Sequence, residues 1–434
     1  MPFRAALSGL NAASNDLRVI GNNVANAGTT GFKKSRAEFA DVYPATNLGV
    51  AANAIGAGVR TAAVSQQFAQ GNIDFTNNIL DLAVSGQGFF RMSDNGTISY
   101  TRAGAFQIDD SGYIVNNIGQ RLTGFQPDTN GNITGALGDI FLDRSDIAPS
   151  PTGALTTNGG ISAVLNLDAN DTPTYAPTAG GAASTFDRTD PTTYNYSTSL
   201  TVYDSLGNPL LATMYFRPTT TANLWEAHLW VTNSAGTAIE VVPNGNVANE
   251  PLRMQFSNTG TLTSVTPQIG AATVADYTPT NPGTGAANLD FEVDFGGTTQ
   301  FGTNFSVNSL TQDGYTSGRL SGVDIGDTGI IQARFTNGQN RVLGQVALAN
   351  FNNPQGLQQL GDTQWAETAD SGAALVGAPS TSSLGVIQSG ALESSNVDLT
   401  EELVKMITAQ RNFQANAQVI STADTITQTI INIR

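Results

Sequence analysis

Both ends of this 434-residue chain carry a helical amphipathic pattern, and the long region between them does not. Near the N-terminus, steps of four and three residues alternate along Phe3, Leu7, Leu10, Ser14, Leu17, Gly21 and Val24. The C-terminal end repeats this spacing along Leu399, Leu403, Met406, Gln410, Phe413, Ala417 and Ile420. Ser14, Gly21 and Gln410 weaken the apolar stripe without breaking it. Alternating steps of this kind keep side chains on one face of a helix. Because such a face needs burial, the pattern predicts two helices that pack on each other or on neighbouring subunits.

Charge supports an assembly subunit and argues against nucleic acid as a partner. Charged residues make up 12% of the chain, about half the usual share. The polar surface must therefore consist largely of Asn, Thr, Ser and Gln, which can pack against copies of itself without desolvating many charges. The net charge is −16, and we find no basic face with interleaved aromatic residues.

Cysteine is absent from the chain, which excludes disulfides and thiolate metal sites. We see no apolar run of about 18 residues, so membrane insertion is not expected. The N-terminal residues also lack the apolar segment of a Sec signal peptide, and export would need another route.

The chain order expected from local patterns is helix, linker, β-rich body, linker, helix. The first helix is predicted from Pro2 to Asn26, with Gly28 closing its end. A weak helical pattern follows at about 35–42. The second helix is predicted to start at Asp398, whose side chain can cap it while Glu401 returns the hydrogen bond.

Between the helices, alternating apolar residues predict short strands separated by turns. One face is expected to hold Ile161, Ala163, Leu165 and Leu167, and another Trp225, Ala227, Leu229 and Val231. Hairpin turns are predicted at Asn95-Gly96, Ser111-Gly112, Asn130-Gly131, Asn244-Gly245 and Asn337-Gly338.

We predict no catalytic, cofactor or metal site. His228 is the only histidine and lies in a strand-like run, where a structural or surface role is expected. Asp128 to Asn132 resembles a calcium loop only in part and is better explained as a turn. Nucleophile-elbow and phosphate-loop motifs do not occur.

Motifs at both ends resemble the bacterial flagellar rod and hook axial protein family. The N-terminal motif is LRVIGNNVAN at 17–26 with TGFK at 30–33, and it includes Asn22, Asn23, Asn26, Gly31, Phe32 and Lys33. The C-terminal motif is DLTEELV at 398–404 with AQRNFQAN at 409–416. Interior motifs resemble hook proteins within this family, namely GQGFF at 86–90, YTRAGAF at 100–106, TVYDSLGNP at 201–209 and NFNNPQGL at 350–357.

This resemblance implies a mainly β fold with terminal helices that pair into one helical domain, the chain running outward through two β domains and returning. The implied parts are an N-terminal helix at 1–28, a linker at 29–75, a first β domain at 76–148 and 306–372, a second outer β domain at 149–305, a linker at 373–396 and a C-terminal helix at 397–434. Leu7, Leu10, Leu17 and Val24 would pack on Leu403, Met406, Phe413 and Ile420. Lys33, Lys34 and Arg36 would pair with carboxylates of neighbouring subunits.

As a hook protein, the chain would form a curved, flexible tube that joins rod to filament and transmits torque. Its partners would be other copies of itself, the rod, the hook cap, the hook–filament junction proteins and the type III export apparatus. It would work outside the cell, as part of the flagellum.

Three other interpretations stay open, of which a carboxylate-based enzyme is the weakest. A distal rod subunit of the same family would be shorter and would lack the region around 201–209. A secreted β-rich adhesin could use Trp225, Trp230 and Trp365 to bind glycans. Trp225 and Trp230 are five residues apart and face opposite sides of a strand, which weakens that interpretation.

Overall fold

The computed structural model divides into two compact units. It describes residues 2–432 except 44–55, 130, 154–159, 174–185, 234, 247–249, 269–270, 279, 284 and 291. The first unit comprises Met1–Arg144, Ser321–Arg334 and Asn340–Arg434, and the second comprises Ser145–Leu320 and Phe335–Gln339.

Two helices lie at the ends of the first unit, as the amphipathic patterns predicted. They are α1 (Pro2–Ala25) and α2 (Leu399–Asn432). The Asp398 carboxylate caps α2 by accepting hydrogen bonds from the backbone N–H groups of Thr400 (2.8 Å) and Glu401 (3.1 Å). Glu401 does not complete a capping box, because its side chain binds Lys34 and Lys405. Neither described helix is long and apolar enough to cross a membrane.

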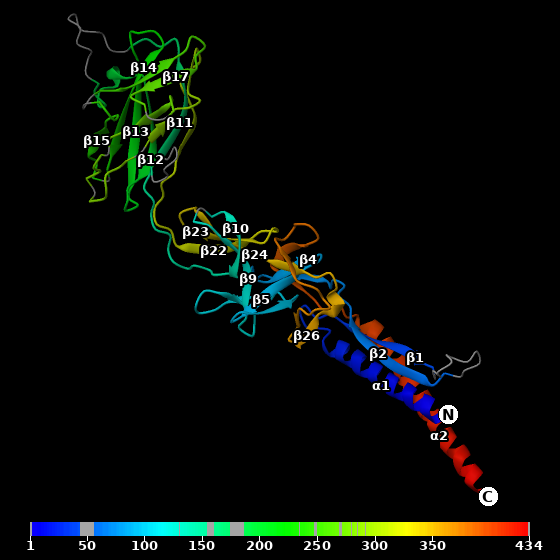
Figure 1. Cartoon of the computed structure of the whole chain (residues 1–434). Coiled ribbons are helices and arrows are strands. Elements are labelled where there is room, and N and C mark those ends of the chain that lie inside the picture. The colour runs from blue at the N-terminus through cyan, green and yellow to red at the C-terminus, as the bar shows by residue number, and fades with distance from the viewer. Residues whose placement is uncertain are drawn as a thin grey trace, which may run out of the picture. The chain divides into compact units, whose positions relative to one another are not determined.

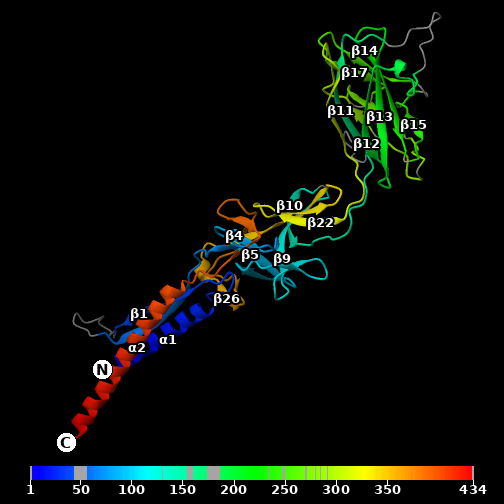
Figure 2. The ribbon, with the colours of Figure 1, turned by 180° about the vertical axis from the view of Figure 1, so that it is seen from behind.

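A β-hairpin runs along α1 and consists of β1 (Ser35–Val42) and β2 (Gly58–Gln66), which pair antiparallel. The helix expected at 35–42 was therefore wrong, since the ladder hydrogen bonds of this segment come from β2, far along the chain. The Ser8 hydroxyl accepts from the backbone N–H of Val59 (3.1 Å), and the Asn15 amide donates to the Thr61 hydroxyl (3.1 Å). Figure 1 and the reverse view in Figure 2 both show this hairpin beside α1.

The β part of the first unit is built from short strands of both outgoing and returning chain. Its main sheet has the order β22-β23-β24-β9-β5-β6-β27-β26, while β29 pairs with β4 and β3 with β30. The strands are β3 (Ile73–Phe75), β4 (Leu82–Ser85), β5 (Phe89–Asp94), β6 (Thr97–Thr101), β7 (Gln107–Ile108), β8 (Ile114–Val115), β9 (Arg121–Pro127), β10 (Ile133–Asp139), β22 (Leu320–Ile325), β23 (Ile330–Phe335), β24 (Asn340–Val346), β25 (Leu348–Asn350), β26 (Gln358–Gly361), β27 (Gln364–Ala366), β28 (Leu375–Gly377), β29 (Val386–Ser389) and β30 (Ala391–Glu393).

An aromatic cluster joins the end of the hairpin to this sheet. Phe68 packs edge-to-face on Phe89 and Trp365, with ring centroids 5.7 and 5.6 Å away. The Trp365 indole N–H donates to the Gln66 side-chain oxygen at 2.5 Å. Trp365 is only 2% exposed, so the structure leaves it no open face for a glycan.

The second unit is a β-sandwich. One sheet has the order β18-β19-β11-β20 with β21 paired to β11, and the other has β12-β13-β14-β16-β17 with β15 paired to β14. The strands are β11 (Gly160–Asp168), β12 (Tyr196–Tyr203), β13 (Pro209–Pro218), β14 (Leu224–Thr232), β15 (Ala238–Val241), β16 (Leu252–Phe256), β17 (Leu262–Thr266), β18 (Val274–Asp276), β19 (Glu292–Asp294), β20 (Thr299–Phe301) and β21 (Ser306–Gln312). Single 3-10 turns occur at Pro191–Thr193 and Pro354–Gly356.

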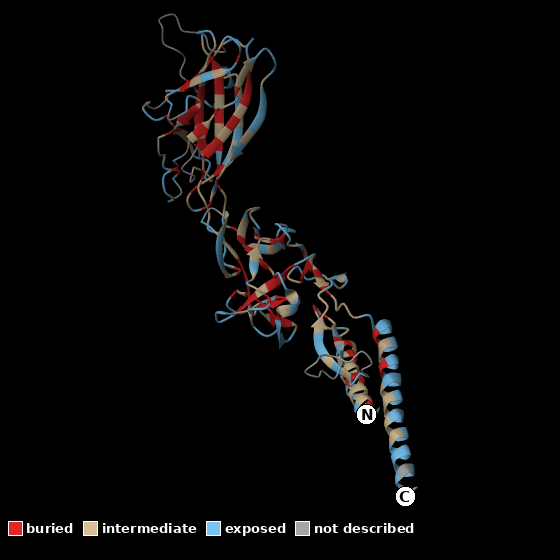
Figure 3. Cartoon of the chain, turned by 45° about the vertical axis from the view of Figure 1, so that its right-hand side comes forward, coloured by how far each residue is buried: buried red, intermediate tan, exposed pale blue. Residues whose placement is uncertain are grey.

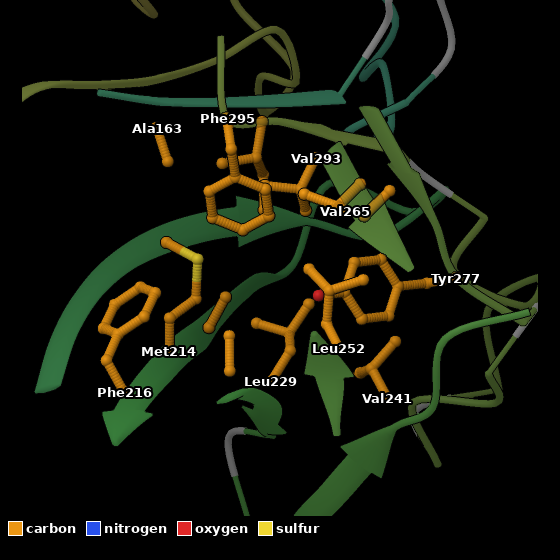
Figure 4. Close-up of a cluster of buried hydrophobic side chains, with 14 of the residues drawn as sticks. Ala163, Met214, Phe216, Leu229, Val241, Leu252, Val265, Tyr277, Val293 and Phe295 are labelled. Carbon is orange, nitrogen blue, oxygen red and sulfur yellow. The ribbon is translucent and has the colours of Figure 1, made fainter. Parts of the chain in front are cut away.

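The sandwich core confirms the predicted alternation. All eight residues expected to face inward on β11 and β14 are at most 2% exposed. Figure 4 shows Met214, Leu229 and Phe295 among the side chains that fill the space between the strands. His228 lies on the other face of β14, buried and stacked on Phe186 with ring centroids 4.0 Å apart. Burial lowers the pKa of His228.

Several predicted turns also occur where expected. Asn95 and Gly96 both have positive φ, +49° and +97°, between β5 and β6, as a two-residue hairpin turn requires. Gly112, Gly245 and Gly338 are left-handed as well, whereas Asn130 lies outside the described residues.

The boundaries between the two units differ from the predicted domain boundaries. The chain passes from the first unit to the second at 144/145 and returns at 320/321, whereas the sequence placed the outer domain at 149–305. The return point lies later because β21 pairs with β11 across residues 306–312. The fold class is as expected: mainly β, with terminal helices that pair.

Candidate functional site: the helix pair and its root

The two terminal helices pack antiparallel against each other along a surface that we call the seam. At one end Gly9 lies so close to Asn416 that an added Cβ would be 2.6 Å from the Asn416 side-chain oxygen. At the other end the Asn23 amide donates to the Glu402 carboxylate at 3.0 Å. The two contacts are fourteen residues apart on both helices, so the seam keeps one register over two heptads.

The seam is made of small and polar residues rather than the predicted leucines. Its most buried members are Ala6, Ala13, Ile20 and Asn23 of α1, with Glu402 and Ala409 of α2. Gly9 leaves room for the Asn416 side chain, which a Cβ at this position would displace. Apart from Ile20, the bulky apolar residues lie beside the seam.

The eight predicted interface residues, which we call the leucine rows, are not buried within the chain. Leu7 and Leu403 are 43% and 50% exposed. The other six are half-buried, namely Leu10, Leu17, Val24, Met406, Phe413 and Ile420. Figure 3 shows how much of the α2 surface stays open, in contrast to the strands of the sandwich. The packing of the two leucine rows on each other therefore stays a prediction.

Both leucine rows face the same side of the helix pair. At 3.6 residues per turn, most row residues lie one i to i+4 step, about 40°, round the helix from a seam residue, as Leu10 does from Ala6 and Phe413 from Ala409. Because the helices are antiparallel, these rotations bring both rows to one side. Ser8 and Asn15, which bind β2, lie on the opposite side of α1. Further apolar residues join the open side, with Phe3 51%, Leu399 49% and Ile407 50% exposed.

Asn23 fixes the place where α1, the hairpin and α2 meet. Its side-chain oxygen accepts from the backbone N–H of Ser35 (2.9 Å), and its amide donates to the Ser35 carbonyl (2.8 Å) as well as to Glu402. Glu402 also accepts from Lys405 at 2.9 Å. Burial and the nearby Glu402 charge raise the pKa of Asp16 on the same face of α1. Asn23 thus uses both donors and its acceptor.

A buried ion-pair cluster holds the root, the region where the chain leaves α1 and returns to α2. The Glu393 carboxylate accepts from the Lys33 ammonium at 2.6 Å and from the Arg102 guanidinium at 3.1 Å, and all three residues are at most 4% exposed. Arg102 also donates to the carbonyl oxygens of Val84 and Gly86. Burial lowers the pKa of both Lys33 and Arg102, and the Glu393 charge opposes that shift.

This cluster corrects the expected role of the basic residues after α1. Lys33 is enclosed with Glu393 of its own chain, so its pairing with a neighbouring subunit was wrong. Lys34 binds Glu401 at 3.1 Å and Arg36 binds Glu38 at 3.0 Å, both near the surface. Contacts of those two residues with neighbours stay a prediction. The sequence carries no local signal for the Lys33–Glu393 pair, because 360 residues separate its members.

The glycine of the family motif is required by close backbone packing. Gly31 has φ +70°, and a Cβ there would lie 2.4 Å from the backbone nitrogen of Ala103. Its N–H donates to the Glu393 carbonyl at 2.8 Å. Gly28, expected to close α1, is not left-handed. The helix ends instead with the Asn26 side chain donating to the Asn22 carbonyl at 2.9 Å.

The remaining motif residues border a polar cleft of about 520 Å³ in the first unit. Asn22, Asn26 and Phe32 line it on the α1 side, and the turn between β26 and β27 lines the other. Asn396 closes the root nearby, because its side chain accepts from the Lys34 N–H (2.8 Å) and donates to the Gln67 carbonyl (2.7 Å). The motif residues thus hold the end of α1 against the chain that enters α2.

Four known families match segments of this chain. Residues 3–33 match the flagella basal body rod protein family, and 83–157 match the flagellar hook protein FlgE/F/G D1 domain. Residues 166–315 match the flagellar basal body protein FlaE D2 domain, and 388–433 match the flagellar basal body rod FlgEFG protein C-terminal family.

Full-length relatives agree. The chain is 38% identical to the flagellar hook protein FlgE of Escherichia coli (strain K12), over 100% of this chain and 100% of that protein. It is 31% identical to the flagellar hook protein FlgE of Borreliella burgdorferi, over 99% of this chain and 98% of that protein. The crystal structure of Helicobacter pylori flagellar hook protein FlgE2 shares the fold, with a TM-score of 0.53 at 13% identity over 74% of this chain and 100% of that one.

The four family matches all describe proteins of the flagellar rod and hook, which are structural components of the bacterial flagellum. The full-length similarity narrows this class: the chain belongs to the flagellar hook protein family.

Proposed function

We propose that this chain is the repeating subunit of a flagellar hook, and that the open leucine rows are its main assembly surface. The observation that carries this proposal is the set of large apolar side chains left uncovered on one side of the helix pair. A contiguous apolar surface of this kind marks a contact with another molecule. The same surface on every copy favours a homopolymer, because each subunit offers and needs the same cover.

The polymer would be a curved, flexible tube that joins rod to filament and transmits torque. The weakly charged outer unit supports flexibility, since contacts between such surfaces desolvate few ions and can slide. The proposed partners beyond other copies are the rod, the hook cap, the junction proteins and the type III export apparatus, at the outside of the cell. The role is structural rather than enzymatic. The seven-part domain division stays a proposal, with the outer domain extended to the bounds Ser145 and Leu320 of the second unit.

The two alternative functions are less well supported. The match of residues 166–315 to a second outer domain favours a hook over a distal rod subunit. Trp225 and Trp365 are 1% and 2% exposed, which removes two of the three glycan platforms that an adhesin would use.

Seeded growth tests the assembly surface. The variant Leu403→Glu places a charge on the leucine rows, at a half-exposed site where the monomer loses little packing. The control Thr408→Glu adds the same charge to an exposed site on another side of α2. We expect electron microscopy to show tubes growing from sheared seeds with the control and not with Leu403→Glu. Equal growth of both variants would contradict the proposal.

A further inference from the structure

The helix pair adopts a packing that its apolar pattern does not favour. If the two helices were turned by about 40°, one i to i+4 step, Leu10 and Leu17 would face Phe413 and Met406 directly. That arrangement would bury more of the leucine rows inside one chain and leave less apolar surface for another copy. The structure instead pairs alanine, glycine and polar faces. Some interaction must therefore offset the apolar burial that is given up.

The Asn23–Glu402 contact has the properties that this role needs. Both residues are 1% exposed, and the contact lies within the seam. Asn23 cannot follow a displaced α2, because two hydrogen bonds of 2.8 and 2.9 Å tie its side chain to the Ser35 backbone. The rotation of α1 is fixed as well, since Ser8 and Asn15 bind β2. Moving α2 towards the leucine rows would thus break the contact.

Polar contacts of this kind select one helix arrangement over others. A hydrogen bond between an amide and a carboxylate is stronger than a neutral one, and it forms only in the matching register and rotation. Apolar side chains spaced by heptads tolerate several arrangements, whereas a single buried asparagine can distinguish them. Glu402 also accepts a hydrogen bond from Lys405 at 2.9 Å, which orients its carboxylate.

We propose that the Asn23–Glu402 contact keeps the chain competent for assembly by holding α2 on the small-residue face of α1, so that both leucine rows stay open for other copies. Asn23 and Glu402 would act as positioning residues, without contacting the neighbouring subunit. The assembly part of the inference rests on the proposed function, while the effect on helix packing concerns the monomer alone.

Cysteine cross-linking can report the packing, because the natural chain contains no cysteine. The pair Gly9→Cys and Asn416→Cys reports the observed seam, and Leu10→Cys with Phe413→Cys reports the leucine-facing arrangement. Each pair is combined with Glu402→Leu, which leaves the Asn23 amide without its acceptor and adds an apolar residue to α2. Glu402→Gln retains an acceptor for that amide. Thr408→Leu is the matched control, because it adds the same leucine at an exposed position on another side of α2.

We expect Glu402→Leu to lower the ratio of seam to leucine-facing cross-links about tenfold, given the usual strength of a hydrogen bond to a charged group. Glu402→Gln should have an intermediate effect, because it keeps a neutral hydrogen bond with Asn23. Thr408→Leu should leave the ratio within about twofold of the parent, as expected for a surface change. Circular dichroism checks that each monomer keeps its helices. Seeded tube growth of Glu402→Leu without added cysteines should need more protein than the parent, by the factor by which the cross-links show the seam-paired fraction to have fallen.

An unchanged cross-link ratio in folded Glu402→Leu would overturn the inference and leave the proposed assembly surface untouched. A seam-paired fraction that falls severalfold with unchanged tube growth would overturn the assembly role of the contact and would count against the leucine rows as the assembly surface. The first result thus counts against the inference alone, and the second counts against both proposals.

Discussion

The sandwich unit and the terminal helix pair differ in how far they bury their large apolar side chains. In the sandwich, both sheets contribute to one core whose residues are at most 3% exposed. In the helix pair, large apolar residues such as Leu403 remain half exposed, while alanine and polar residues fill the seam. The sandwich therefore encloses its apolar core within a single chain, whereas the helix pair leaves apolar surface that the proposed assembly would cover. If that proposal is correct, the difference separates the part that folds from the part that assembles.

The largest expected effect tests the completeness of the sandwich. Phe295→Ala removes a fully buried ring shown in Figure 4 and should lower the free energy of unfolding by about 3–5 kcal/mol. Leu403→Ala, the matched truncation on α2, should lower it by less than about 1 kcal/mol in the monomer, because half of that side chain is already in water. Urea unfolding of both variants measures the difference. Similar losses at the two sites would break the comparison.

A second large effect is expected at the root, where the protein encloses charged rather than apolar side chains. Glu393→Ala leaves Lys33 and Arg102 buried beside each other without their carboxylate. We expect the free energy of unfolding to fall by about 3–5 kcal/mol, the usual result of removing one partner from a buried ion pair. Glu38→Ala, which removes an exposed pair with Arg36, is the control and should change little. Thermal unfolding followed by circular dichroism gives both values.

How far the sequence predicts each region follows from the range of the contacts. Alternation along β11 and β14 is local, and it correctly identified core residues such as Leu165 and Trp225. Heptad spacing likewise identified both helices. The rotation of the helices could not be predicted, because the apolar stripe is stronger than the alanine and glycine face that actually forms the seam. The Lys33–Glu393 pair and the β1–β2 hairpin depend on residues distant in the chain.

An intermediate effect is expected at Gly31, whose conformation links the end of α1 to the root. Gly31→Ala introduces a Cβ at a left-handed residue only 2.4 Å from the Ala103 backbone. We expect a loss of about 1–3 kcal/mol in the free energy of unfolding. Gly28→Ala is the matched control, because no atom lies within 4 Å of its Cβ position and its φ is not left-handed. Equal effects at the two glycines would show that the root does not constrain Gly31.

The smallest effect concerns the surface charges beside the root and sharpens the contrast with the buried cluster. Hydrogen bonds from Lys405 and Lys34 lower the pKa of Glu401 to about 2. A carboxylate with a lowered pKa binds fewer protons in the folded than in the unfolded chain, so its stabilisation is present above the unfolded value, about 4.5, and is lost as the pH falls towards 2. Because Glu401 is largely exposed, the contribution is small. The free energy of unfolding of Glu401→Gln should therefore be slightly lower than that of the parent at pH 6, and the two values should coincide at about pH 2. A difference that persists unchanged at low pH would mean that Glu401 stabilises the root through packing rather than charge.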